Sequence, residues 1–243
     1  MTFDATTFKV STKAQWNAVA DRWNAWGPLL DTWLGPATEM LLDMCEVTEG
    51  SEVMHVAGGS GQDAMQSARR VGPTGRVVST DFSEELTRIA AENFEAEGLA
   101  HISAMTMDGE AIEVKGDPFD VVLSRVGLIF FPDQLGSVRS QMAALKPGGR
   151  VGALVYATPQ ECRFFSDPVA IIRRHAGTQA CPRQRRGCPG HSALANQVRS
   201  RPCSKKPGSG TFGQRRSMRR CCLKAPESAS GLNRRALVPF TRC

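Results

Sequence analysis

The chain has 243 residues, of which 41% are hydrophobic and 22% charged. This composition is typical of a globular protein and not of a wholly disordered chain. Its longest apolar runs, such as residues 126–131, are far shorter than the roughly 18 residues that span a bilayer. The N-terminal segment lacks the apolar core of a secretory signal. Membrane-spanning and exported proteins are therefore disfavoured, and the cytoplasm is the expected location.

The net charge of +6 is unevenly distributed along the chain. Residues 1–175 contain 15 Lys and Arg against 23 Asp and Glu, a net charge of −8. Residues 176–243 contain 15 Lys and Arg and a single acid, a net charge of +14, and they hold six of the eight cysteines. This asymmetry separates an acidic part from a basic tail, and basic tails are typical of nucleic-acid binding.

Residues 1–45 are expected to form a helical layer. One helix is expected around residues 17–26, where tryptophans recur at helical spacing. Gly27-Pro28 is expected to end it, and Leu34-Gly35-Pro36 to open a second helix. All four tryptophans of the chain lie in residues 16–33. This aromatic stripe either packs on a core or forms a lid over a pocket for a flat, apolar substrate, and the two roles are compatible.

Residues 46–175 alternate between short apolar strands and amphipathic helices. Strands are expected at residues 52–56, 76–80, 102–107, 119–123 and 151–157, with helices at residues 62–70, 84–97 and 135–145. This alternation indicates an α/β protein with a Rossmann-like, doubly wound, mostly parallel sheet and helices on both faces. In such sheets ligands bind beyond the C-terminal ends of the strands.

The first strand runs into a glycine-rich loop, VAGGSGQDA, at residues 56–64. Its glycines allow a tight turn and a close approach of a ligand, and the following helix points free N–H groups at that ligand. Asp81 lies 22 residues after Gly59, at the end of the second strand, where a carboxylate can bind both hydroxyls of a ribose. The glycine-rich loop also satisfies a dinucleotide-binding pattern, so by itself it does not identify the cofactor. For Asp81, the alternative to ribose binding is a structural role in a turn or as a helix cap.

Two further segments follow in the same order. Asp108-Gly109-Glu110 comes after the third strand, where a carboxylate can accept a hydrogen bond from the exocyclic amino group of adenine. LKPGGR, at residues 145–150, lies between a helix and the fifth strand. By itself this segment is compatible with a simple helix stop, but its place in the order makes it informative.

Five motifs in this order resemble the class I S-adenosylmethionine-dependent methyltransferases: VMHVAGGSGQDA, VVSTDFS, MDGEAI, FDVVLSRVGLIFF and LKPGGRVGALVY. The chain is most similar to the ubiquinone/menaquinone biosynthesis-like branch, from about Trp16 to His175. The resemblance implies S-adenosylmethionine as cofactor and a small, apolar or aromatic, quinone-like acceptor. It implies direct in-line displacement, for which the protein supplies orientation and water exclusion. No residue stands out as a general base.

The resemblance also implies the residues that bind the cofactor. The methionine part of the cofactor would be lined by Ala57, Gly58, Gly59 and Gly61. The ribose would be held by Asp81, and the adenine would lie beside Phe82 with its edge against Asp108 and Gly109. The reacting centre would be faced by Ser124 and Arg125.

His55 is a departure from the family pattern within this set. Members of the family usually carry Asp or Glu at this position, where the acid helps to fix the glycine loop and the ammonium end of the cofactor. A protonated imidazole would repel the ammonium and sulfonium groups. Cofactor binding is therefore expected to be weaker than in a His55→Asp variant.

From about residue 176 the helix and strand periodicities end. Arg, Pro, Gly, Ala, Ser and Cys make up 45 of the last 68 residues, and large apolar residues are too sparse to offset the ordering of a packed unit. A zinc module, and with it any metal site, is disfavoured because Cys181 and Cys188 are seven residues apart and Cys221 and Cys222 are adjacent. A basic arm that binds nucleic acid non-specifically, with a strong dependence on salt, is a second interpretation.

A shifted reading frame is the favoured interpretation of this tail, because GC-rich codons read out of frame yield this composition. The C-terminal strands of the sheet would then be missing, the tail disordered and the edge beside the fifth strand exposed.

The expected organisation is thus a helical lid (1–45), an S-adenosylmethionine-binding Rossmann-like domain (46–175) and a basic tail (176–243). Three functions stay open: a small-molecule methyltransferase, a frame-shifted chain that binds the cofactor but turns over poorly, and a basic-tailed nucleic-acid-binding protein. The sequence assigns neither the acceptor atom nor the oligomeric state.

Overall fold

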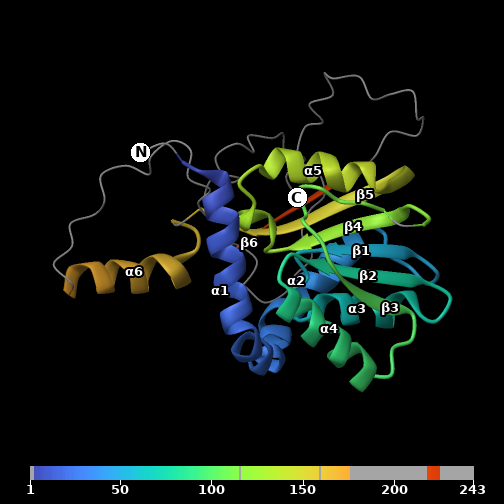
Figure 1. The fold of residues 1–243 in the computed structure, drawn as a ribbon, viewed down its shortest axis with the longest axis horizontal. Helices are drawn as coiled ribbons and strands as arrows, with labels where there is room; N and C mark the ends of the chain where they lie inside the picture. Colours follow the sequence, from blue (N-terminus) through green and yellow to red (C-terminus); the bar gives the residue numbers. More distant parts are fainter. Residues whose placement is uncertain (1–2, 115, 159, 176–217, 225–243) are drawn as a thin grey trace, which may run out of the picture.

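A computed structural model of the chain describes residues 3–114, 116–158, 160–175 and 218–224. The described part is built around one sheet (Figure 1). Its elements in chain order are α1 (Ala5–Ala25), α2 (Gly27–Met44), β1 (Glu52–Val56), α3 (Gln62–Val71), β2 (Arg76–Asp81), α4 (Glu84–Ala96), β3 (Ile102–Thr106), β4 (Phe119–Arg125), the 3-10 helix η1 (Leu128–Phe130), α5 (Gln134–Ala143), β5 (Leu145–Tyr156), α6 (Arg163–His175) and β6 (Met218–Lys224).

The sheet has the strand order β3-β2-β1-β4-β5-β6, in which β1 to β5 are parallel and β6 is antiparallel to β5. The order reverses at β1, since β2 pairs on one side of it and β4 on the other. The predicted fold class, a Rossmann-like and mostly parallel sheet, is confirmed. The reversal point is where such sheets open a crevice for ligands.

Helices cover both faces of the sheet, with α5 on one face and α2, α3 and α4 on the other (Figure 1). Alternate residues of each central strand therefore enter different cores. On β1, for example, Val53 packs with the α2–α4 layer and Met54 with the α5 layer. Both faces of the strands are buried, which explains their nearly continuous apolar sequences.

The first two helices differ in part from the sequence prediction. Gly27-Pro28 does separate α1 from α2, but Leu34-Gly35-Pro36 lies inside α2 and does not open it. A proline inside a helix costs roughly 3 kcal/mol. Here the apolar face of α2 continues on both sides of Pro36, through Leu34 before it and Leu41 and Leu42 after it, all of them buried. Burial of this continuous face outweighs the local cost.

Residues 218–224 form β6, a strand that the sequence analysis did not predict. It pairs with β5 from Arg150↔Lys224 to Tyr156↔Met218. The expected exposed edge beside β5 is therefore wrong, because β6 covers it. The predicted disorder of the tail and absence of a further strand are likewise wrong for residues 218–224. The disorder predicted for residues 176–217 and 225–243 lies outside the described residues, and it and the shifted frame stay predictions.

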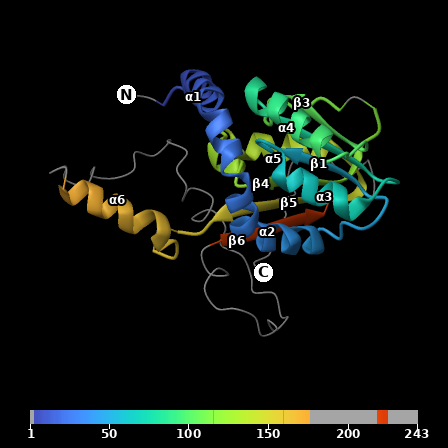
Figure 2. The ribbon, with the colours of Figure 1, turned by 90° about the horizontal axis from the view of Figure 1, so that it is seen from below.

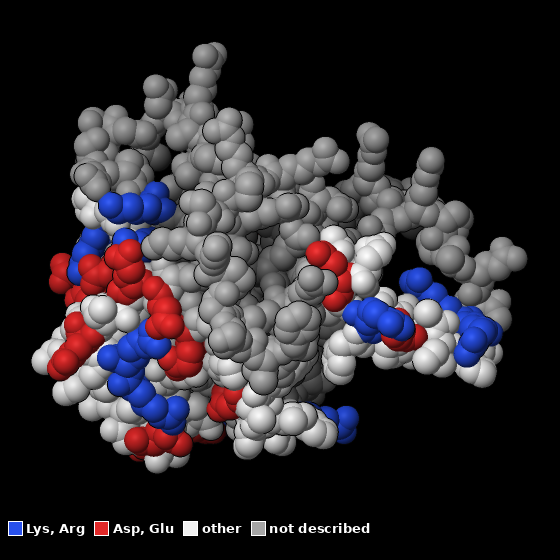
Figure 3. All heavy atoms as spheres, turned by 180° about the vertical axis from the view of Figure 1, so that it is seen from behind, with Lys and Arg blue, Asp and Glu red and all other residues white. Residues whose placement is uncertain are grey.

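The last described helix before the tail, α6, stands apart from the sheet in two perpendicular views (Figures 1 and 2). Its Phe164 ring lies 5.3 Å from the ring of Trp33 on α2. On the face shown in Figure 3, acidic and basic side chains of the described residues are interspersed and do not form a field of one sign. The predicted nucleic-acid contact rests on the tail, of which the structure describes only residues 218–224, and it stays a prediction.

Candidate cofactor and substrate site

A cavity of about 250 Å³ lies at the C-terminal edge of the parallel strands. Each parallel strand contributes a residue at or just after its end: Ala57 after β1, Asp81 of β2, Met107 after β3, Arg125 of β4 and Tyr156 of β5. The helix α1 adds Lys9, Trp16 and Trp23. The cavity therefore occupies the place where a doubly wound sheet binds its ligands.

The glycine-rich loop after β1 forms one wall of this cavity. Ala57, Gly59 and Gly61 all have positive φ, at 57°, 58° and 91°, and Ala57 adopts this conformation with a side chain. A Cβ on Gly61 would lie 2.4 Å from the Phe94 ring, so the loop needs glycine there for close packing as well as for its backbone angle. The loop is tied to β2, because the Gly58 N–H donates to the Thr80 carbonyl at 2.9 Å.

Asp81 lies at the end of β2 and is almost fully buried. One carboxylate oxygen accepts from the Gly59 N–H and the other from the Ser83 N–H, both at 3.0 Å. Burial raises the pKa of this carboxyl to about 6, although the N–H groups of Ser83, Gly59 and Phe82 act in the opposite direction. Asp81 thus fixes the glycine loop and the start of α4 while it faces the cavity.

Asp108 and Gly109 also line the cavity, on the side of β3. The carboxylate of Asp108 receives the Lys9 ammonium of α1 at 2.6 Å, and the same ammonium reaches Glu110 at 2.5 Å. Gly109 is required by packing, since a Cβ there would lie 2.6 Å from both Phe131 and Val56. Lys9 therefore connects α1 to Asp108, one of the residues that were predicted to contact the edge of the adenine.

Aromatic side chains of α1 and η1 also line the cavity. The Trp16 ring stands edge-on to Trp23, with centroids 5.2 Å apart, and edge-on to Phe130 of η1, at 5.5 Å. Aromatic pairs in this geometry contribute about 0.5–1.5 kcal/mol beyond burial. Trp16 and Trp23 therefore pack on α4 and also line the cavity, whereas the role of this layer as a lid over a substrate stays a prediction.

At the end of β4 the two predicted residues behave differently. Arg125 lines the cavity, whereas Ser124 is fully buried and does not line it, and its hydroxyl has no hydrogen-bond partner among the described residues. The next residue, Val126, lines the cavity with a φ of 63°. A positive φ is costly for a β-branched residue, and such strain tends to gather at functional sites.

Behind the glycine loop lies a buried charged cluster. His55 Nδ1 lies 3.1 Å from Asp63 Oδ2, and His55 Nε2 lies 2.8 Å from the Ser67 hydroxyl. Asp63 Oδ2 also lies 3.5 Å from Arg125 Nε, and Arg125 donates to Thr38 of α2 at 3.3 Å. Burial by itself raises the pKa of Asp63, but the neighbouring Arg125 and His55 outweigh it and hold the pKa at about 2. The cluster joins β1, α3, β4 and α2.

The structure brings most of the predicted site residues to one cavity. Seven of them line it: Ala57, Gly59, Asp81, Phe82, Asp108, Gly109 and Arg125. His55, Gly58, Gly61 and Ser124 lie behind the lining, and the cofactor-binding roles of all eleven stay predictions. Sequence reasoning missed Lys9, Asp63 and Tyr156. Only Tyr156 carried a usable signal, as the one tyrosine of the chain, at the end of an expected strand.

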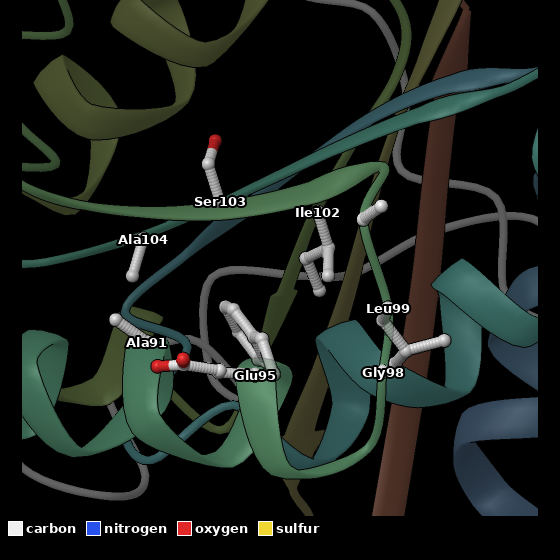
Figure 4. Close-up of a pocket in the computed structure, with 9 residues that line it drawn as sticks. Ala91, Glu95, Gly98, Leu99, Ile102, Ser103 and Ala104 are labelled. Atoms are coloured by element: carbon white, nitrogen blue, oxygen red, sulfur yellow. The ribbon is translucent and has the colours of Figure 1, made fainter.

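A second, larger hollow of about 580 Å³ lies between α4 and the edge strand β3 (Figure 4). Its walls are mainly small or apolar side chains, among them Ala91, Leu99 and Ile102, with Glu95 and Ser103 as polar members. None of the predicted site residues lines it, and the loops at the C-terminal strand ends do not reach it. Size alone therefore does not identify the functional cavity.

The structure describes part of the chain, residues 3–114, 116–158, 160–175 and 218–224. Within it, no cluster of three or more His, Cys, Asp or Glu residues is arranged to hold a metal ion. Nor does any helix there combine the length and apolar character needed to cross a bilayer.

Comparison with known proteins gives one consistent result. Residues 36–171 match the profile of the ubiE/COQ5 methyltransferase family. The ubiquinone/menaquinone biosynthesis C-methyltransferase UbiE of Pseudomonas entomophila is 32% identical over 119 residues, which are 49% of this chain and 46% of that protein. UbiE of Pasteurella multocida is 30% identical over 132 residues, 54% of this chain and 47% of that protein.

Among solved structures, the chain is similar to a SAM-dependent methyltransferase from Aquifex aeolicus, with 21% identity and a TM-score of 0.47. That match covers 58% of this chain and 78% of the other. The matched segment spans about half the length of the curated UbiE relatives.

Proposed function

The chain belongs to the ubiE/COQ5 methyltransferase family, and we propose that it transfers a methyl group from S-adenosylmethionine to a small apolar or aromatic acceptor. The convergence of all five parallel strand ends on one cavity under an aromatic helix carries the proposal. The names of the UbiE relatives add the finer suggestion of carbon methylation on a quinone-type ring.

The residues around the cavity fit this cofactor. The loop at Gly59 and Gly61 has the backbone that admits a close ligand, and the start of α3 points N–H groups toward a carboxylate. The buried carboxylate of Asp81 would receive the ribose hydroxyls, and Phe82 would pack on the adenine. When bound, S-adenosylmethionine supplies a methyl group that the adjacent sulfonium activates for displacement.

The chain's own contribution is orientation and the exclusion of water. Trp16, Trp23 and Phe130 would hold a flat acceptor against the glycine loop, because their edge-on contacts form a rigid apolar wall. Burial raises the pKa of Tyr156 to about 12, so its phenol stays protonated at neutral pH and can donate a hydrogen bond to an acceptor oxygen. No proton transfer is assigned to any residue of the cavity.

The size of the cavity implies that α1 acts as a lid. Small-molecule sites usually enclose about 300–1,000 Å³, and the 250 Å³ cavity lies below that range. An outward shift of α1 would make room for a cofactor and an acceptor together. Contacts that hold α1 in place include the Lys9–Asp108 ion pair, the Trp16–Phe130 ring pair and the hydrogen bond from Ser83 to Asn17. We propose residues 1–45 as a lid on the domain formed by residues 46–175.

Transfer of a radiolabelled methyl group to a panel of hydroxylated aromatic and quinone-precursor compounds tests this function. The full chain should label at least one of these compounds, and Asp81→Asn should lose most of the labelling. Asp21→Asn, on the exposed side of α1, is the matched control and should keep it, because the Asp21 side chain is 92% exposed. Cofactor binding without labelling of any acceptor would favour the impaired chain predicted as an alternative. Salt-dependent retention on DNA without cofactor binding would favour the nucleic-acid interpretation.

A further inference from the structure

Two cysteines from opposite ends of the chain meet at the edge of the sheet. Cys45 follows the last turn of α2 and is fully buried, and Cys222 lies on β6, half-buried. Their sulfur atoms are 3.1 Å apart although 177 positions separate them in the sequence. Figure 2 shows β6 passing beside α2.

Gly152 of β5 explains how the two thiols come together. It is the cross-strand partner of Cys222 in the β5–β6 register. A Cβ on Gly152 would lie 2.4 Å from the Cys45 sulfur. The Cys45 sulfur therefore occupies the space that a side chain at position 152 would fill. Cys45 from the helix layer and Cys222 from the neighbouring strand thus converge on one glycine, and packing holds both thiols in position.

We propose that Cys45 and Cys222 are a redox modification site that closes to a reversible disulfide and fastens the C-terminal strand to the N-terminal helical layer. A sulfur separation of 3.1 Å requires an approach of about 1 Å to reach the bonded distance of roughly 2.05 Å. Because Cys222 belongs to an outer strand, that approach moves an edge of the sheet and not its centre.

The two thiols are suited to different roles. The hydrogen bond from Cys45 lowers the pKa of Cys222, whereas the contact with Cys222 and burial raise the pKa of Cys45. Cys222 is also the more exposed of the two. Attack therefore begins at Cys222, as expected for the thiol with the greater thiolate fraction.

With glutathione disulfide as oxidant, the Cys222 thiolate attacks one of its sulfur atoms, forming a mixed disulfide and releasing one glutathione thiolate. Cys45 then attacks the Cys222 sulfur while its proton passes to the departing glutathione thiolate, which leaves as the second glutathione. The two cysteines lose two electrons, the glutathione disulfide gains them, and the products are one protein disulfide and two glutathione molecules.

The bond would constrain the ends of a very long loop, which is the arrangement in which a cross-link most restricts the unfolded chain. Oxidation should raise the melting temperature by roughly 5 °C or more, given the size of the chain. The disulfide should also affect the candidate site. It fastens β6, which pairs with β5, and β5 ends at Tyr156 in the cavity wall.

The test uses the full chain with Cys181, Cys188, Cys203 and Cys243 replaced by serine, so that only Cys45, Cys162, Cys221 and Cys222 remain. After incubation with glutathione disulfide, non-reducing peptide mapping should recover a peptide containing Cys45 joined to one containing Cys222. Cys222→Ser should abolish that product and the melting-temperature shift. Cys221→Ser and Cys162→Ser, the matched controls, should keep both.

Two results would overturn the proposal. One is that Cys45 and Cys222 both stay open to alkylation after oxidation and unfolding. The other is that the cross-link survives in Cys222→Ser and disappears in Cys221→Ser, which would place the reactive thiol one residue away. If Cys45→Ser does not fold, the pair Cys222→Ser and Cys221→Ser decides the question alone, because both substitutions lie on the outer strand.

Discussion

The imidazole Nδ1 of His55 lies 3.1 Å from Oδ2 of Asp63, and both side chains are buried. The other ring nitrogen is satisfied by Ser67, so the imidazole makes both of its hydrogen bonds within the protein. His55 occupies the position where an acid was expected, and Asp63 supplies a carboxylate beside it, on α3 instead of β1. Asp63 thus places a buried carboxylate next to the imidazole of His55.

This relationship changes what a His55→Asp variant should do. Two carboxylates within hydrogen-bond distance in a buried site oppose each other's ionisation. The single variant should therefore lose on the order of 3 kcal/mol in the free energy of unfolding, measured by urea denaturation. The tighter cofactor binding predicted from the sequence should appear only when Asp63→Asn is added.

His55→Asn is the control, because it has the shape of aspartate without its charge. It should be more stable than His55→Asp and bind the cofactor no better than the wild type. The account of the cluster fails if His55→Asp alone keeps wild-type stability and binds the cofactor more tightly.

Cofactor affinity should depend on pH through Asp81. Its pKa is raised to about 6, so the carboxylate that would receive the ribose hydroxyls is protonated below that pH. At pH 5 the dissociation constant should be about 10-fold larger than at pH 7.5, following simple one-proton titration. Asp81→Asn should bind weakly at every pH, with a flat profile across this interval.

The raised pKa of Asp81 also makes the stability of the folded chain depend on pH. Because the folded pKa of Asp81 lies above its ordinary value of 3.8, the native state binds the proton more tightly than the unfolded state. The resulting stabilisation is complete below about pH 4 and is lost as the pH rises through 6. Circular dichroism between pH 5 and 7.5 should thus show a folded chain throughout, and loss of affinity together with unfolding would contradict this account.

Trp16→Ala should open the lid. The variant removes the edge-on contact that connects α1 to Phe130 of η1 and the one with Trp23 within α1, and stability should fall by roughly 1–3 kcal/mol. If the ring is a wall of the acceptor site, KM for the acceptor should rise more than kcat falls. Trp26→Ala is the matched control, since Trp26 is 60% exposed and does not line the cavity. Equal effects of the two variants on KM would remove Trp16 from the site.

Tyr156→Phe should separate acceptor positioning from cofactor binding. With its pKa near 12 the phenol serves as a donor and not as a base at neutral pH. Loss of one such hydrogen bond should lower kcat/KM for the acceptor by about 10-fold, while calorimetry should show the cofactor affinity of the wild type. An inflection in the pH–rate profile of the wild type near neutral pH that disappears in Tyr156→Phe would instead make the tyrosine a proton-transfer group.

Much of the site followed from local rules. Asp81 and Asp108 were predicted from their places after the second and third strands, and both line the cavity because the C-terminal ends of parallel strands meet at one edge. The glycine loop was predictable for a related reason, since positive φ at Gly59 and Gly61 is a backbone requirement that shows directly in the sequence.

The missed residues depend on contacts between distant parts of the chain. Lys9 reaches Asp108 across 99 positions, and no periodicity records such a pair. The helix through Pro36 and the pairing of β6 with β5 are also set by tertiary packing, which overrode the local signals of proline and of a basic, low-complexity tail. Asp63 lies in the first turn of α3, whereas its partners His55 and Arg125 belong to β1 and β4, so no local pattern marks it.

The central claim, that this cavity binds S-adenosylmethionine, is tested most directly by calorimetric titration of the full chain with the cofactor. The account predicts binding at one site per chain, strongly weakened in Asp81→Asn and unchanged in Asp21→Asn. Absence of binding by a folded wild-type chain, or equal affinity in Asp81→Asn, would contradict it.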